Sequence, residues 1–171
     1  MSNDYVIKNG FLLGPNVNMS GTDLTNIDLS SLSLRGVNFE GVNLTNAVMR
    51  DTDLTGANLN NATLNKVITK NIVFDGETTL PLGYNFKNQY LVGPYLVLDN
   101  IDFTGVEFVG LSLESVSLQG AILLDANFSG VNLKGANLSD ANLRRTNLGS
   151  ANLTNAILTN VISGITDINA I

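Results

Sequence analysis

Residues Gly135 to Leu158 read GANLSDANLRRTNLGSANLTNAIL, a unit of five residues that recurs almost without change. In each unit a small residue is followed by a polar one, then by a large apolar one, then by two hydrophilic residues. The same spacing extends from this stretch through most of the chain of 171 residues. A fixed short period of this kind indicates a repeat architecture.

The large apolar residue in the middle of each unit is called the central residue below. Central residues fall in two series, one running in steps of five from Met19 to Leu64 and the other from Leu98 to Leu158. A smaller residue, such as Ala57 or Ala141, lies two positions before many of them.

Neither a helix nor a flat strand can use this spacing. Five residues of α-helix turn through about 500°, which would spread the central residues around the whole cylinder. In a flat strand, residues five apart point to opposite faces. The pattern instead predicts three extended residues, with the small and the central residue pointing inward, followed by a polar corner. Four such sides close a coil of about 20 residues, and coils stack through backbone hydrogen bonds at roughly 4.8 Å.

The charged residues of the two series support this model. All of them, from Asp23 to Arg145, occupy corner or outward positions, and none occupies an inward one. Burying an unpaired charge costs several kcal/mol, so this distribution is typical of a filled, dry core. Ile27, Leu32 and Leu111 place bulky groups in the small-residue slot, and we expect their coils to be wider.

The units ANLSD, ANLRR, ANLTN and TDLTG resemble the A(D/N)LXX repeat of the pentapeptide-repeat proteins. The resemblance covers residues 17–74 and 96–168, with Thr69 as a break in the run of apolar central residues. It implies an all-β fold, a right-handed quadrilateral β-helix with about 20 residues per coil, interrupted in the middle of the chain. It also implies a bacterial source, with cyanobacteria as the leading expectation.

A longer duplication explains the interruption. YVIKNGFLLGP (Tyr5–Pro15) matches YNFKNQYLVGP (Tyr84–Pro94) 79 residues later, and LNKVITKNI from Leu64 matches LTNVISGIT from Leu158. The chain therefore reads as two modules, each with a leader, a repeat block and a similar exit segment. The predicted boundaries are 1–16 for the N-terminal leader or cap, 17–74 and 96–168 for the repeat blocks, 75–95 for the linker and second leader, and 169–171 for the C-terminal end.

Each leader has two interpretations. Asn9 and Gly10, between short apolar runs, predict a two-residue type I′ hairpin turn, and Asn88 and Gln89 form a less favourable pair in the second copy. Such a hairpin could cap the first coil, with Phe11, Leu12 and Leu13 covering its open interior. Alternatively, the aromatic residues of the Tyr84–Pro94 leader could bind a partner, because aromatic side chains are enriched in interfaces. The sequence leaves capping and binding open.

The composition excludes several classes of function. The chain has no Cys and no His, which removes thiolate nucleophiles, the commonest general base and the commonest metal ligand. Asp51 and Asp53 lack the further carboxylates of a calcium loop, and Arg144 with Arg145 is an isolated, solvent-facing pair. We therefore expect no catalytic, cofactor-binding or metal-ligating residue, no cofactor and no enzymatic activity.

The charge and hydropathy patterns bear on partners and location. A net charge of −6 and the lack of a basic patch argue against nucleic-acid binding. No signal peptide and no membrane span are recognisable, so a cytoplasmic location without membrane contact is expected.

The predicted function is a non-enzymatic structural or protein-interaction scaffold with an unidentified protein partner. The apolar segment VISGITDINAI also suggests a homodimer formed through an end of the solenoid, with folding of this segment over the last coil as the alternative. The family resemblance adds one alternative, mimicry of DNA to bind gyrase, as in quinolone resistance. Mimicry needs carboxylates stacked along one face, whereas residues 20 apart place Asp23 over Asn43 and Glu107 over Asn127. The alternative is therefore disfavoured.

Overall fold

The computed structural model describes residues 4–164, so the predicted C-terminal end at 169–171 lies outside the described residues. All regular elements within that range are β-strands, and no helix in it is long and apolar enough to cross a membrane. The named strands are β1 (Val6–Lys8), β2 (Phe11–Leu13), β3 (Val48–Arg50), β4 (Ile68–Lys70), β5 (Asn85–Lys87) and β6 (Tyr90–Val92). The all-β class expected from the repeat is confirmed.

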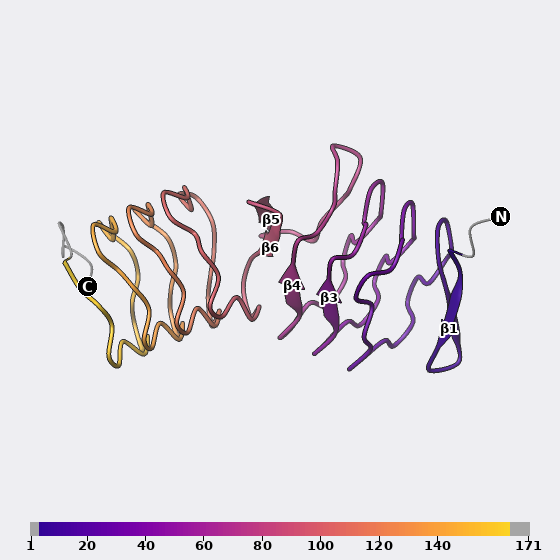
Figure 1. Ribbon diagram of the computed structural model, residues 1–171, viewed down its shortest axis with the longest axis horizontal. Coiled ribbons are helices and arrows are strands. Elements are labelled where there is room, and N and C mark those ends of the chain that lie inside the picture. Colours follow the sequence, from indigo (N-terminus) through magenta and orange to yellow (C-terminus); the bar gives the residue numbers. More distant parts are fainter. Residues whose placement is uncertain (1–3, 165–171) are drawn as a thin grey trace. The chain divides into compact units, whose positions relative to one another are not determined.

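The chain divides into two compact units, each a β-solenoid (Figure 1). The first comprises Met1–Leu82 with Gln89–Leu91, and the second Gly83–Asn88 with Val92–Ile171. Within each unit, parallel bridges join residues 20 positions apart, as in Asn18 to Asn38 and Asn127 to Asn147. β3 and β4 are the longest of these parallel pairings, with Val48 opposite Ile68.

A tight turn follows each central residue. At Leu24, for example, the carbonyl accepts a hydrogen bond from the Ile27 amide at 3.2 Å, and Asn26 between them has a φ of 61°. A positive φ at the third residue is the requirement of a type II turn, which Gly and Asn satisfy best. This requirement explains why Gly, Asn, Asp or Ser recurs two positions after the central residue.

The predicted inward positions form the core of each unit. Central residues from Leu24 to Leu64 and from Leu98 to Leu148 are almost completely buried. In the second unit, Phe108 stacks on Phe128 with ring centroids 4.4 Å apart and meets Phe103 edge to face at 5.2 Å. Burying each such side chain contributes about 1.5–3 kcal/mol, so the repeated core stabilises the coils.

Three threonines are the buried polar residues among those described, and each finds a partner inside. The Oγ1 atoms of Thr52 and Thr146 donate to the carbonyls of Leu29 and Leu123, at 3.1 and 2.7 Å. Thr69, which breaks the run of apolar central residues, donates to the Leu91 carbonyl at 3.3 Å. A hydroxyl is tolerated in this core because its hydrogen bond is satisfied.

Two details depart from a uniform repeat. Leu32 and Leu111, unlike Ile27, are only half-buried, so these bulky groups are partly displaced from the core instead of filling it. The parallel ladder also continues beyond residue 74, because Thr79 bridges Asn58 across 21 positions rather than 20. The coil between Asn58 and Thr79 is therefore one residue longer than the others.

Both leaders form the predicted hairpins. β1 and β2 pair antiparallel with Lys8 opposite Phe11, and both turn residues have positive φ, 50° at Asn9 and 83° at Gly10. β5 and β6 pair in the same way, and Asn88 and Gln89 have φ values of 47° and 63°. The second turn thus adopts the left-handed conformation without a glycine.

The expectation that Phe11, Leu12 and Leu13 all cover the first coil is wrong for Leu12. Successive residues of a strand point to opposite faces. Leu13 is accordingly fully buried, while Leu12 is 52% exposed on the other face, beside its cross-strand partner Ile7.

Candidate interaction surfaces

The outward faces of the repeats, called the walls below, are made of side chains that bond to their own backbone. The residue before each central residue, usually Asn or Asp, accepts a hydrogen bond from the amide two positions later. Asp23 does so from Thr25 at 3.0 Å, and Asn142 from Arg144 at 3.2 Å. This local bond explains the Asn or Asp of the repeat unit.

The same side chains also bond from coil to coil. The Nδ2 of Asn38 donates to Oδ1 of Asn18 at 3.1 Å, and that of Asn58 donates to Oδ1 of Asn38 at 3.2 Å. These stacked amides are surface hydrogen-bonding groups. Because much of their polar capacity is used internally, they leave little for a ligand.

The wall carboxylates are held ionised by the same contacts. Hydrogen bonds from the Thr25 hydroxyl and amide lower the pKa of Asp23, and those from Thr104 lower the pKa of Asp102. At Asp53, burial acts to raise the pKa, but hydrogen bonds from Thr55 and Arg35 outweigh it and the net shift is downward. Such groups favour the anionic form and do not suit proton transfer near neutral pH.

The two aspartates considered as metal ligands occupy different positions. Asp51 lies at a corner with a φ of 54° and accepts from Asn71 Nδ2 at 2.8 Å. Asp53 faces outward and contacts Arg35 Nη1 at 3.2 Å. Among residues 4–164, no group of three His, Cys, Asp or Glu side chains is arranged to hold a metal ion. Both carboxylates thus contact neighbouring side chains of the coil, Asn71 and Arg35, and are not paired with each other as metal ligands.

The basic pair is solvent-facing, as predicted. Arg145 makes two bonds to Asp125, from Nε to Oδ1 at 2.5 Å and from Nη2 to Oδ2 at 2.7 Å. This bidentate contact occupies the groups that would clamp a phosphate. The 20-residue period places Asp125 next to Arg145, and the structure adds that their side chains bond directly.

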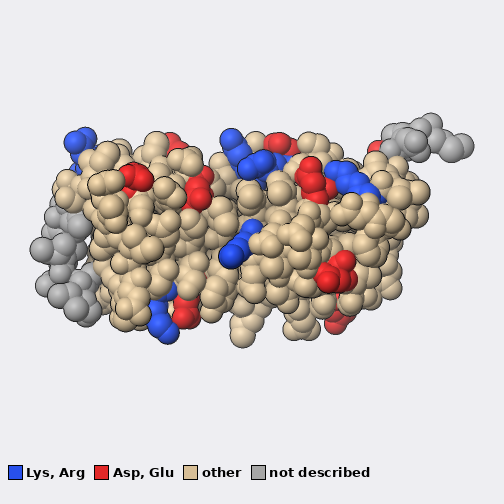
Figure 2. Space-filling model, turned by 90° about the horizontal axis from the view of Figure 1, so that it is seen from below, with Lys and Arg blue, Asp and Glu red and all other residues tan. Residues whose placement is uncertain are grey.

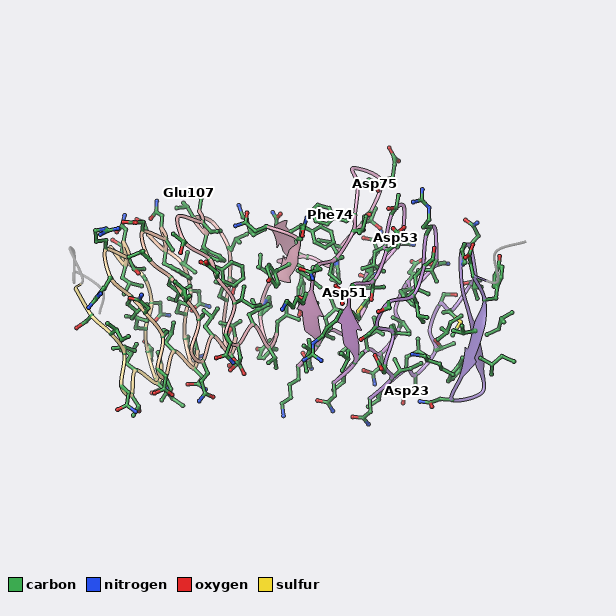
Figure 3. All side chains as sticks on the ribbon, in the orientation of Figure 1. Asp23, Asp51, Asp53, Phe74, Asp75 and Glu107 are labelled. Atoms are coloured by element: carbon green, nitrogen blue, oxygen red, sulfur yellow. The ribbon has the colours of Figure 1, made fainter. Side chains whose placement is uncertain are left out.

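Charges of both signs alternate along the walls. The bridges place Asp23 beside Asn43, Asp28 beside Val48, and Glu107 beside Asn127, which confirms that these carboxylates do not stack. Figure 3 shows Asp23 at the lower edge of the first unit, while Asp53 and Asp75 lie toward its upper edge. On the face drawn in Figure 2, the charged groups form small clusters, several of them with acidic and basic groups side by side, on a mostly uncharged surface.

The first tyrosine of each leader bonds and packs within that leader. Tyr5 donates its hydroxyl to the Pro15 carbonyl at 3.1 Å, and Tyr84 donates to Pro94 at 3.0 Å. A Cβ added at Gly14 would collide with the Tyr5 ring, and one at Gly93 with the Tyr84 ring. Burial, with a smaller effect of Tyr95, raises the pKa of Tyr84 to about 12. Each ring therefore closes its own leader by packing on a glycine.

Exposed large apolar side chains are unevenly distributed over the described residues, 4–164. Eight of the eleven lie in the leaders, the linker or the last described coil, and three lie on the repeat walls. The eight are Tyr5, Ile7, Leu12, Leu82, Tyr95, Ile157, Leu158 and Ile162, and the three are Val73, Val109 and Ile122. Leu82 is completely exposed, next to Gly83 with a φ of 89°. Exposed apolar side chains of this kind are where a protein partner can gain binding energy.

The first unit ends in a contact that the sequence did not predict. The Gln89 carbonyl accepts a bond from the Ile72 amide at 2.8 Å, and the Leu91 carbonyl accepts one from the Thr69 hydroxyl. Residues 89–91 thus lie on the exit segment 64–72, and Leu91 is only 1% exposed. The sequence between residues 72 and 89 has no pattern that predicts this contact.

Several solved structures are similar to this chain. A trypsin-treated form of QnrB1, a plasmid-mediated fluoroquinolone resistance protein, is 16% identical, with 86% of this chain and 73% of that chain covered and a TM-score of 0.44. HetL, a pentapeptide-repeat protein involved in heterocyst differentiation regulation in Nostoc sp. strain PCC 7120, is 25% identical over 86% and 83%, with a TM-score of 0.29. Rfr23 from the cyanobacterium Cyanothece 51142 is 18% identical over 92% and 85%, with a TM-score of 0.25.

No curated protein sequence matches the chain. The family profile described as pentapeptide repeats (8 copies) matches residues 33–68, 97–135 and 121–160, which together make up more than half of the chain. The chain belongs to the pentapeptide-repeat family.

Proposed function

We propose that this protein is a non-enzymatic scaffold that binds another protein. The observation that carries the proposal is the contrast between its surfaces. The walls use their polar groups in internal hydrogen bonds, whereas most exposed large apolar side chains lie in the leaders, the linker and the last described coil. Desolvated apolar and aromatic side chains supply most of the binding energy of protein interfaces.

We infer further that each unit is a right-handed, four-sided coil of about 20 residues. The bridges between residues 20 apart and the positive-φ corners at five-residue intervals support this geometry. A coil of this kind supplies rigid walls, and the segments that depart from it remain as the places where specificity can reside.

Gyrase binding by DNA mimicry is the less favoured function. A mimic of duplex DNA needs a continuous acidic track, and here each of Asp23, Asp28, Asp102 and Glu107 bridges an uncharged residue. Inhibition of gyrase supercoiling by micromolar protein would overturn this preference. The expected cytoplasmic location is likewise a proposal, to be checked by cell fractionation.

Affinity capture from cells of the source organism tests the scaffold role. The bait is the full chain, and the informative variant is Leu82→Ser, because Leu82 is completely exposed and its replacement leaves the core intact. We expect a protein that is retained by the wild type and lost with this variant.

Val109→Ser is the matched control, since Val109 is an exposed apolar residue on a repeat wall. We expect it to retain the captured protein. Loss of capture with Val109→Ser and not with Leu82→Ser would place the binding surface on the wall and contradict the proposal.

A further inference from the structure

The first hairpin presents an uncovered apolar face. Its inner face packs on the first coil, where Leu13 is buried and Lys8 Nζ donates to the Asp28 carbonyl at 2.7 Å. On the outer face, the cross-strand partners Ile7 and Leu12 are 75% and 52% exposed. Two large apolar side chains side by side form a surface whose burial is favourable in free energy.

The duplicated leader offers a comparison for this face. Leu91 is the counterpart of Leu12, 79 residues later, and it is buried rather than exposed. It lies on the exit segment of the first unit, where its carbonyl accepts the hydroxyl hydrogen bond of Thr69. The same leader sequence is therefore seated on an exit segment once within this chain.

The second exit segment lacks such a cover among the described residues. Leu158 is the counterpart of Leu64, and it is 41% exposed where Leu64 is 1% exposed. Ser163 is the counterpart of Thr69, and its hydroxyl is the same kind of donor on an exposed residue. The last described coil thus offers an exposed apolar side chain and a hydroxyl donor at the positions that correspond to Leu64 and Thr69 of the first exit segment.

We propose that a second copy of this chain docks head to tail, its first hairpin lying on the last coil of the first copy. Leu12 takes the place of Leu91, and the Leu12 carbonyl accepts the Ser163 hydroxyl as the Leu91 carbonyl accepts that of Thr69. The two docking surfaces differ, so the contact is heterologous and each copy keeps one free head and one free tail. Association is then open-ended and rises with concentration.

This inference deepens the proposed interaction role by naming a second copy as the partner of the first hairpin. Its test uses purified protein alone, so its failure would leave the capture experiment with Leu82→Ser unaffected. Failure of the capture experiment would equally leave the self-association result standing.

Sedimentation velocity of the full chain from about 10 µM to about 1 mM, the range of weak protein contacts, measures the association. We expect the average mass to rise above the monomer mass of 18.2 kDa with concentration. Leu12→Lys removes the head and Ser163→Lys removes the tail, each weakening association at least about 100-fold because an unpaired charge would be buried. Val109→Lys, an equal charge change on a wall, should associate like the wild type.

Mixing the two variants distinguishes head-to-tail docking from other contacts. Leu12→Lys retains a tail and Ser163→Lys retains a head, so the mixture should form a one-to-one pair that grows no further. A symmetric head-to-head contact would lose association only with Leu12→Lys, and a tail-to-tail contact only with Ser163→Lys. Either result, or a wild type that stays monomeric throughout the range, would overturn the proposal. Circular dichroism of each variant confirms that it is folded.

Discussion

Replacing Ala141 by Lys tests the inward position of the repeat. Ala141 is fully buried, its amide donates to the Leu138 carbonyl at 3.1 Å, and its carbonyl accepts the Ile162 amide at 2.9 Å. The backbone at this position is therefore fixed on both sides, and the added side chain must enter a filled core.

Two costs add at this position. An unpaired ammonium group in an apolar core costs several kcal/mol, and overpacking costs about 1–3 kcal/mol more. The sum exceeds about 5 kcal/mol, which is comparable to the whole stability of an ordinary domain. We expect Ala141→Lys to unfold the coils around it at room temperature.

Asn142→Lys is the matched control, because the next residue points outward. It loses the Asn142 Oδ1 bond to the Arg144 amide, which costs about 0.5–1.5 kcal/mol. Chemical and thermal unfolding followed by circular dichroism compares the two variants. If the free energies of unfolding of Ala141→Lys and Asn142→Lys agreed to within about 1 kcal/mol, typical of an ordinary surface change, the inward assignment would be refuted.

Three further outcomes are expected. Gly93→Ala should lower the free energy of unfolding by about 1–3 kcal/mol, because its methyl group collides with the Tyr84 ring, whereas Gly76→Ala has open space and should change it by less than about 1 kcal/mol in denaturant titrations. Burial raises the pKa of Tyr84 to about 12 from its usual 10, so the stability it contributes is present below pH 10 and is lost as pH rises through 12; Tyr84→Phe should flatten the fall in melting temperature over that interval. Hydrogen bonds from Ser30 lower the pKa of Asp28, so the stability that Asp28 contributes is present above about pH 4 and is lost as pH falls through the lower pKa of the folded state. Asp28→Asn should therefore reduce the fall in melting temperature at acid pH.

The repeats could be predicted from the sequence because the conformation of each five-residue unit depends on residues within that unit. The inward position of Leu24 and the left-handed corner at Asn26 both follow from local rules, namely burial of apolar groups and turn geometry. The hairpin at Asn9 and Gly10 was predictable for the same reason. Repetition strengthened each of these local signals.

Features that depend on distant residues could not be predicted in the same way. The extra residue before Thr79 could not be predicted from DGETTL, because this segment has no central residue that shows the register of the coil. The pairing of Arg145 with Asp125 and the seating of Leu91 on Thr69 require the coils to be in place first. The outward face of Leu12 follows from strand alternation, which a count of apolar residues in the leader overlooks.

The walls use their polar groups internally, and we expect the first hairpin and the last described coil to be the segments that interact. Hydrogen–deuterium exchange at low and at high protein concentration measures this most directly. We expect added protection in residues 4–13 and 157–164 at high concentration, with no change in wall residues 127–142. Added protection along 127–142, or none at the two predicted segments, would contradict this expectation.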